Sequence, residues 1–368
     1  MNPVNTDPLH TRLCEEYGAE VPIVGFCHTR DVVAAVTNAG GIGVLGAGGL
    51  TPTELRASIH WIRDRVGDKP FGVDFLMPAS LVEGNPEDLE AQIPQGHRDF
   101  VAKIMAENAI PKARERKAPD GQTLKHLREK LDILFAERIK IFASGLGSPA
   151  FLLEEAHSHG TKVWGLIGLP RQAQRQIEAG VDVVIAQGYD AGGHTGTVGT
   201  FTLVPEVVRM AEGTHTLILA AGGVNNGRQL AGVIAMGAAG VWTGTIWQAT
   251  HESEVEMHFK QRLVQARAED PDQSLAWSGK LNRHLPSKFT DAWKQPGAPP
   301  PLPMPLQGML VSELQAGVKE NHMEDWMSIP AGQSVVGIRA IKPAAEVVYD
   351  MVGEAQDCFD RLGGLVVA

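Results

Sequence analysis

The chain has 368 residues, 43% of them hydrophobic and 21% charged, and a formal net charge of −10. This is an ordinary composition for a globular protein, and the length suffices for one large domain or for a large and a small one. The negative charge argues against the basic face that nucleic-acid binding requires.

The cysteines and the apolar segments indicate a cytoplasmic protein. Cys14, Cys27 and Cys358 lie far apart and form no CxxC pair, which argues against a disulfide framework and against a thiolate zinc site. The first twenty residues are polar, so no signal peptide is expected. No apolar run reaches the ~18 residues of a membrane helix, so no membrane partner is expected.

Short β-branched segments alternate with longer helical patterns, as in proteins built from βα units. Helix signals include the N-cap, Pro and Glu of Thr51-Pro-Thr-Glu54. The predicted strands number eight: 21–25, 41–45, 71–75, 139–143, 162–167, 181–186, 216–220 and 240–243. Eight such strands predict an α/β fold, a (β/α)8 TIM barrel. A doubly wound sheet is the alternative.

Two segments interrupt this alternation. Residues 77–137, after the third strand, are too long for a simple connection and predict a helical insertion. Residues 251–330 are helical at first and proline-rich at 296–305, and they predict a smaller helical lobe over the barrel mouth that selects the substrate. The barrel would then comprise residues 1–250 and 331–368.

The glycine-rich segment Gln187–Gly196 follows the sixth strand, at the end of the barrel where active sites lie. Gly192 and Gly193 lack Cβ atoms, so the backbone there can approach a large flat ligand. His194 follows directly and is the candidate catalytic residue. The alternative is that the segment is only a tight connection.

A second glycine cluster follows the last two barrel strands. Gly222 and Gly223 come after the seventh strand, and Gly244 and Thr245 come after the eighth. Their backbone amides can bind phosphate oxygens without a basic side chain, which suits an acidic protein. The alternative is that these glycines serve tight turns alone. Nothing in the sequence indicates a metal site.

Six elements together resemble the nitronate monooxygenase family, formerly called 2-nitropropane dioxygenases. They span nearly the whole chain: Ala39-Gly-Gly-Ile-Gly43, Phe71-Gly-Val-Asp74, Gln187–Gly196, Ala221-Gly-Gly-Val224, the run from Met236 to Thr245, and Ala331-Gly-Gln333. The resemblance implies bound flavin mononucleotide (FMN). It implies that His194 lies near the flavin N5 and the substrate.

The same resemblance assigns the other cofactor-binding residues. Gly222, Gly223, Gly244 and Thr245 match the phosphate site. Gln187, Gly192 and Gly193 match the loop that contacts the flavin ring and ribityl chain. Gln333 matches a C-terminal residue close to the flavin.

The chain departs from the family at two places expected to contact the flavin. Gly25, Phe26 and Cys27 stand where the family has a Pro-Met or Gly-Met turn, and Asp74 stands where it has an asparagine. A carboxylate at that place would disfavour an anionic reduced flavin unless it is protonated or hydrogen-bonded.

Other polar residues predict structural roles rather than a part in the chemistry. His157 and His159 resemble a metal pair, but i,i+2 spacing on a helix separates their rings, so solvent exposure is expected. Asp190 is expected to hydrogen-bond within its own turn. The segment 278–283 resembles a basic part of the family's second lobe, facing the cavity or forming surface salt bridges.

The expected function is an FMN-dependent monooxygenase that oxidises alkyl nitronates or nitroalkanes with O₂ to carbonyl compounds and nitrite. One alternative is an NAD(P)H-dependent flavin reductase of quinones or enoyl thioesters. Another, of a different class, is a flavin-free barrel that binds a phosphate ligand. The expected partners are a small-molecule substrate and O₂, and the sequence leaves open whether the chain forms a homo-oligomer.

Overall fold

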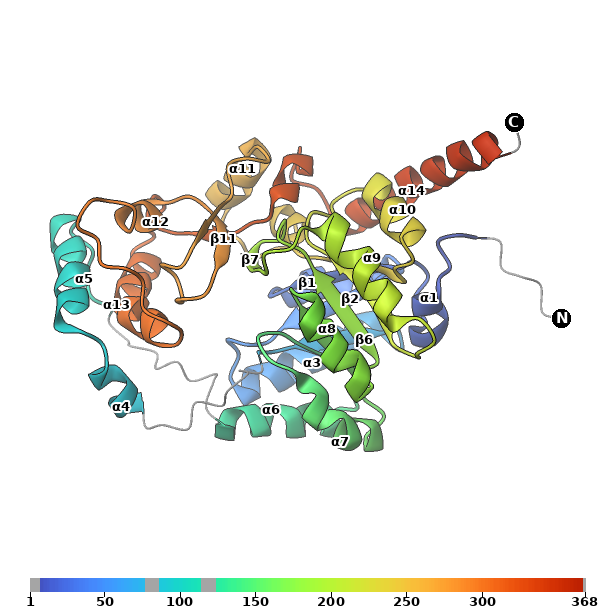
Figure 1. Cartoon of the computed structure of the whole chain (residues 1–368), viewed down its shortest axis with the longest axis horizontal. Coiled ribbons are helices and arrows are strands. Elements are labelled where there is room, and N and C mark those ends of the chain that lie inside the picture. The colour runs from blue at the N-terminus through green and yellow to red at the C-terminus, as the bar shows by residue number, and fades with distance from the viewer. Residues whose placement is uncertain (1–6, 77–85, 114–123, 367–368) are drawn as a thin grey trace.

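Eight parallel strands close into a barrel at the centre of the protein (Figure 1). The structure is a computed structural model, and it describes residues 7–76, 86–113 and 124–366. The barrel strands are β1 (Ile23–Cys27), β2 (Ile42–Gly46), β3 (Phe71–Asp74), β4 (Ile141–Ser144), β5 (Lys162–Ile167), β6 (Val183–Gln187), β8 (Leu217–Ala221) and β9 (Gly240–Thr243). β9 pairs with β1 to close the ring. The predicted TIM barrel is confirmed, and the doubly wound alternative is wrong.

The barrel strands are apolar on both faces because both faces are covered. Val24, Trp164 and Leu219 fill the interior, while neighbouring positions such as Val73 and Val163 pack outward. The surrounding helices are α2 (Arg30–Asn38), α3 (Pro52–Val66), α6 (Leu124–Ala136), α7 (Leu153–Ser158), α8 (Pro170–Ala179), α9 (Thr200–Ala211), α10 (Gly227–Ala235) and α14 (Ala344–Val366). The capping box predicted at Thr51 begins α3.

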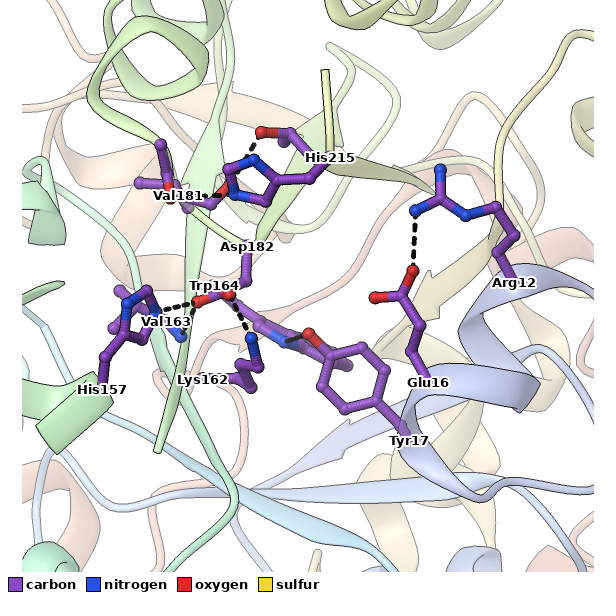
Figure 2. Close-up of polar contacts among 12 residues, drawn as sticks. Arg12, Glu16, Tyr17, His157, Lys162, Val163, Trp164, Val181, Asp182 and His215 are labelled. Atoms are coloured by element: carbon purple, nitrogen blue, oxygen red, sulfur yellow. Dashed lines mark hydrogen bonds and ion pairs between the residues drawn. The ribbon is translucent and has the colours of Figure 1, made fainter. Parts of the chain in front are cut away.

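The amino-terminal edge of the barrel is held by Asp182, which directly precedes β6 (Figure 2). Its carboxylate accepts hydrogen bonds from His157 Nε2 at 2.7 Å, Lys162 Nζ at 2.9 Å and the Val163 amide at 2.8 Å. His157 is exposed, as expected, yet it belongs to this structural cluster. Among the described residues, no group of three or more His, Cys, Asp or Glu side chains could hold a metal ion.

The amino-terminal helix α1 (Arg12–Tyr17) packs against the same edge of the barrel. Trp164 Nε1, inside the barrel, donates to the Tyr17 hydroxyl at 3.0 Å, and the two rings meet edge to face (Figure 2). This edge is therefore a packed, structural end, and the opposite edge is open to form a site.

The lobe of residues 251–330 contains a small antiparallel sheet as well as helices. Its helices are α11 (Met257–Gln265), α12 (Lys288–Ala292) and α13 (Leu306–Glu320); its strands are β10 (Asp272–Ser274), β11 (Asn282–Leu285) and β12 (Ile329–Pro330). A fourth strand, β7 (Gly193–His194), comes from the connection between β6 and α9 and pairs with β11. β7 and β11 lie where barrel and lobe meet (Figure 1).

The described helices of the insertion predicted over residues 77–137 divide between the two parts of the molecule. Its helices α4 (Pro86–Ala91) and α5 (Gln95–Glu107) contact α13, and the apolar face of α5 belongs to the core of the lobe. Its last helix, α6, packs against α3 on the barrel. Within the described ranges, no helix is long and apolar enough to span a membrane.

Candidate active site

His194 leaves the barrel and joins the sheet of the lobe. It lies on β7 directly opposite Asn282 of β11 in an antiparallel pair. Gly193 before it has φ of +72°, a left-handed conformation that favours glycine. The backbone carbonyl of His194 accepts a hydrogen bond from Gln187 Nε2 at 2.5 Å, which ties β7 back to the end of β6. The ring is therefore fixed by both parts of the molecule.

The His194 ring is surrounded by polar groups of the lobe. Its Nε2 lies 2.8 Å from Ser278 Oγ and 3.4 Å from Asn282 Nδ2. Burial of the ring, together with the positive charge of Lys280, lowers the pKa of His194 to about 4. The ring is consequently neutral near pH 7, with one nitrogen able to donate a hydrogen bond and the other able to accept one.

A cavity of about 550 Å³ lies beside His194. Its walls come from the ends of β5 and β6, from η1 (Pro149–Leu152), from α8 and from the loop that follows His194. The charged side chains that line it are Arg175 and Lys280, and no Asp or Glu lines it within the described part of the chain. In a protein of net charge −10, a cavity whose charged lining residues, among those described, are both cations favours an anionic ligand.

The glycines after β8 and β9 have the geometry of an anion-binding backbone. Gly222 and Gly223 have φ of +84° and +76°. Together with Gly244, their amides donate no hydrogen bond to another described group, so they are available to a ligand. Thr245 begins the 3-10 helix η2 (Thr245–Ala249), and its hydroxyl accepts a hydrogen bond from the Gly332 amide at 3.0 Å.

The C-terminal segment packs tightly on the glycine-rich loop. A Cβ on Gly192 would lie 2.7 Å from the Ala331 carbonyl carbon and from the Gly332 nitrogen, a distance too short for any side chain. The amide of Gln333 donates to the Asp190 carbonyl at 2.9 Å. Thus Gln333 lies beside the loop 187–196, although it follows it by well over a hundred residues.

The expected residues of β1 point in different directions. The Phe26 ring faces the barrel interior and stacks on Trp242 with ring centroids 5.4 Å apart. Gly25 faces α2, because a Cβ there would lie 2.9 Å from Val36 Cγ2, and Cys27 is buried in the same outer cluster. Only Phe26 therefore presents its side chain to the interior; Gly25 and Cys27 can contact a ligand there through backbone atoms alone.

Asp74 is the last residue of β3. It shares the interior-facing parity of Gly72, since Phe71, Val73 and Phe75 pack outward. Its carboxyl group forms no hydrogen bond with another described residue, and burial raises its pKa to about 7. A substantial share of Asp74 is therefore protonated at neutral pH, and in that form the carboxyl can donate a hydrogen bond.

Three lobe residues at the site were not anticipated individually: Ser278, Asn282 and His284. The sequence indicated only a basic segment over 278–283. Asn282 and His284 would have been identifiable from their i,i+2 spacing on a strand, but a helical lobe was expected there, and β11 carries mostly polar residues. The expected hydrogen bond of Asp190 within its own turn is not formed: its carboxylate instead accepts from the Thr200 amide at the start of α9 at 2.8 Å.

Fold and site together define a TIM-barrel enzyme whose ligand site lies at the carboxyl ends of the strands, under a small second lobe. The family model described as Nitronate monooxygenase matches residues 11–354. The chain belongs to the nitronate monooxygenase family and is an oxidoreductase.

Curated relatives cover most of the chain. A Mycobacterium tuberculosis protein named "Putative monooxygenase Rv1533" is 41% identical over 97% of this chain and 100% of its own length. A Staphylococcus haemolyticus protein named "Probable nitronate monooxygenase" is 27% identical over 83% of this chain and 85% of its own.

Solved structures share the fold over almost the whole chain. Nitroalkane oxidase from Streptomyces ansochromogenes is 25% identical with a TM-score of 0.79, covering 95% of this chain and 99% of that one. FabK from Thermotoga maritima is 28% identical with a TM-score of 0.74, covering 96% and 99%. The enoyl reductase domain of MlnA from Bacillus amyloliquefaciens, at 12% identity and a TM-score of 0.67 over 96% and 98%, shares the fold alone.

Proposed function

We propose that the protein is an FMN-dependent monooxygenase that oxidises nitronates with O₂ to carbonyl compounds and nitrite. The observation that carries this proposal is the neutral His194 at the wall of a cavity whose charged lining groups are both cationic. A nitronate is a small anion, so Arg175 and Lys280 favour its entry over that of a neutral nitroalkane. Family membership supports the same reaction.

The residues at the barrel mouth fit FMN. The free amides of Gly222, Gly223 and Gly244 suit its phosphate. The bare backbone at Gly193, where a Cβ would meet nothing within 4 Å, leaves room for a flat ring system, whereas the bare side of Gly192 is filled by Ala331 and Gly332. When bound, FMN supplies the redox chemistry and the reaction with O₂. Protonated Asp74, on the interior face of β3, is able to donate a hydrogen bond to a ligand at the mouth.

His194 binds the substrate in this proposal. A neutral imidazole can donate a hydrogen bond to a nitronate oxygen, and Ser278 Oγ at 2.8 Å holds the ring in place. When a neutral nitroalkane is the substrate, the same ring accepts the α-proton as general base. The positive charge of Lys280 disfavours protonation of the ring, so it helps to keep His194 in the neutral form that both roles require.

Anaerobic titration of the purified protein tests the proposal. We expect a yellow preparation whose flavin is reduced by ethyl nitronate in the absence of NADH and NADPH. Failure of every nitronate to reduce the bound flavin would overturn the proposal.

A second candidate is an NAD(P)H-dependent flavin reductase of quinones or enoyl thioesters. It is favoured by the likeness to FabK over almost the whole chain and by the presence of an enoyl reductase domain on this fold. In that case NADH or NADPH would bleach the flavin and ethyl nitronate would not. A colourless protein that gains no thermal stability from FMN would instead indicate a flavin-free phosphate-binding barrel.

A further inference from the structure

The strand β11 carries an unusual concentration of buried polar atoms without partners. Eight side-chain nitrogen and oxygen atoms in the described residues are buried and lack a hydrogen bond, and four of these belong to β11. They are Asn282 Oδ1, Arg283 Nε, and both ring nitrogens of His284. Buried polar groups in native proteins are normally hydrogen-bonded, and each exception calls for a cause.

Three of these four atoms lie on one face of the strand. Asn282 and His284 are two residues apart, so their side chains point to the same side of β11, whereas Arg283 points to the other and contacts Tyr189. Asn282 is the cross-strand neighbour of His194, and its Nδ2 lies 3.4 Å from His194 Nε2. The unpartnered atoms therefore adjoin the histidine at the cavity wall.

The chemistry of the two side chains defines what they can bind. His284 is 2% exposed, and burial together with the proximity of His194 lowers its pKa to about 4, so the ring is neutral. A neutral imidazole offers one donor and one acceptor, and Asn282 Oδ1 adds a second acceptor. A nitronate group supplies acceptors only and would satisfy one of these three atoms. A hydroxyl or amide group both donates and accepts.

We propose that Asn282 and His284 bind a hydroxyl or amide group of the substrate, so that the enzyme selects nitronates carrying such a group over unsubstituted alkyl nitronates. This inference rests on the proposed function for the reaction. A site built to hydrogen-bond a substrate group discriminates strongly against analogues that lack it, because its buried polar atoms then stay unpaired. These atoms are closed to solvent, so the inner face of the lobe must shift when the substrate enters.

The test compares short ω-hydroxyalkyl nitronates of increasing length with alkyl nitronates of matching length. For at least one length, we expect kcat/KM of the wild-type enzyme to favour the hydroxylated compound by about tenfold or more. His284→Phe should reduce this preference to about twofold or less while the alkyl nitronate still reacts. Asn282→Leu should also reduce the preference for the hydroxylated compound.

His258→Phe is the matched control. His258 also has a buried ring nitrogen without a partner, but it lies on α11 beside Glu256 and Glu324. This variant should keep the wild-type preference. Thermal unfolding and flavin content of all variants establish that they are folded.

A binding measurement separates this inference from the proposed function. The neutral ω-nitro alcohols and the nitroalkanes of equal length are compared by thermal shift of the flavin-bound protein. If the alcohols bind more tightly than the nitroalkanes and His284→Phe abolishes this difference, the inference is supported even if no nitronate reduces the flavin. The inference would be overturned if the wild-type enzyme bound and oxidised both series equally well, or if a preference for the hydroxylated compounds survived His284→Phe. So would a substrate-bound crystal structure with an ordered water between Asn282 and His284.

Discussion

His194 of the barrel and Ser278 of the lobe meet at 2.8 Å between Nε2 and Oγ, across a sequence separation of 84 residues. The candidate catalytic ring is thus held by a hydroxyl group of the other part of the molecule. Its orientation depends on how the lobe sits on the barrel, and changes at this contact are expected to affect catalysis more than flavin binding.

Replacing His194 should impair proton removal from neutral nitroalkanes. General-base catalysis contributes about 10²–10⁴-fold, so His194→Gln should slow anaerobic flavin reduction by nitroethane within that range. Reduction by ethyl nitronate, which needs no proton removal, should fall less. Stopped-flow absorbance measures both rates. Ser278→Ala, which removes only the support of the ring, should have a smaller effect; equal loss with both substrates would contradict the assigned role.

Lys280 should contribute measurably to the low pKa of His194. Burial is the larger cause and the charge of Lys280 the second, so Lys280→Met should raise the pKa of His194 from about 4 while leaving it below the ordinary value of 6.5. An NMR titration of the His194 Cε1 proton measures this change. Arg175→Met is the control, because Arg175 lines the same cavity but is not a cause of the shift. Both variants should raise KM for ethyl nitronate.

Asp74 should make the protein less stable as pH rises. Its pKa is about 7 in the folded state against 3.8 unfolded, so the folded state binds the proton more tightly. Stability from this group falls as pH rises from about 4 to 7, by up to about 4 kcal/mol at 1.36 kcal/mol per pKa unit. Asp74→Asn should therefore raise Tm at pH 8 and change it little at pH 4.

Exposed Asp64→Asn on α3 provides the comparison for Asp74, and it should shift Tm equally at both pH values. If Asp74→Asn gained no more stability at pH 8 than at pH 4, the carboxyl group would not be the buried, unpartnered acid that the structure shows.

The Asp182 cluster should stabilise the closed edge of the barrel. Burial alone would raise the pKa of Asp182, but the hydrogen bonds from His157, Lys162 and the Val163 amide lower it overall. Asp182→Asn should reduce the free energy of unfolding by about 1–3 kcal/mol at pH 7. The difference should shrink below pH 4, as the wild-type carboxylate becomes protonated. Urea denaturation at both pH values tests this. The control is Glu206→Gln, which removes one partner of the surface ion pair with Arg209 on α9 and is expected to change nothing.

The barrel was predictable because each strand is an apolar segment between glycine and helix signals. All eight strands lie within two residues of their predicted positions, although β6 begins at Val183 rather than at 181. The pairing of β7 with β11 was not predictable, since Gly193–His194 is too short to show alternation and its partner lies some ninety residues away. Asn282 and His284 could not be predicted for the same reason, because they come close to His194 only when the lobe has folded against the barrel.

The division of the insertion has a consequence for how the chain folds as it is synthesised. Val101, Ile104 and Met105 on α5 find their packing partners Leu310, Val311 and Leu314 on α13, which the ribosome delivers some two hundred residues later. Throughout that interval the apolar face of α5 is uncovered while the barrel strands are synthesised. Such a face is a site for premature association, which makes the nascent chain a candidate for chaperone protection until α13 has been synthesised.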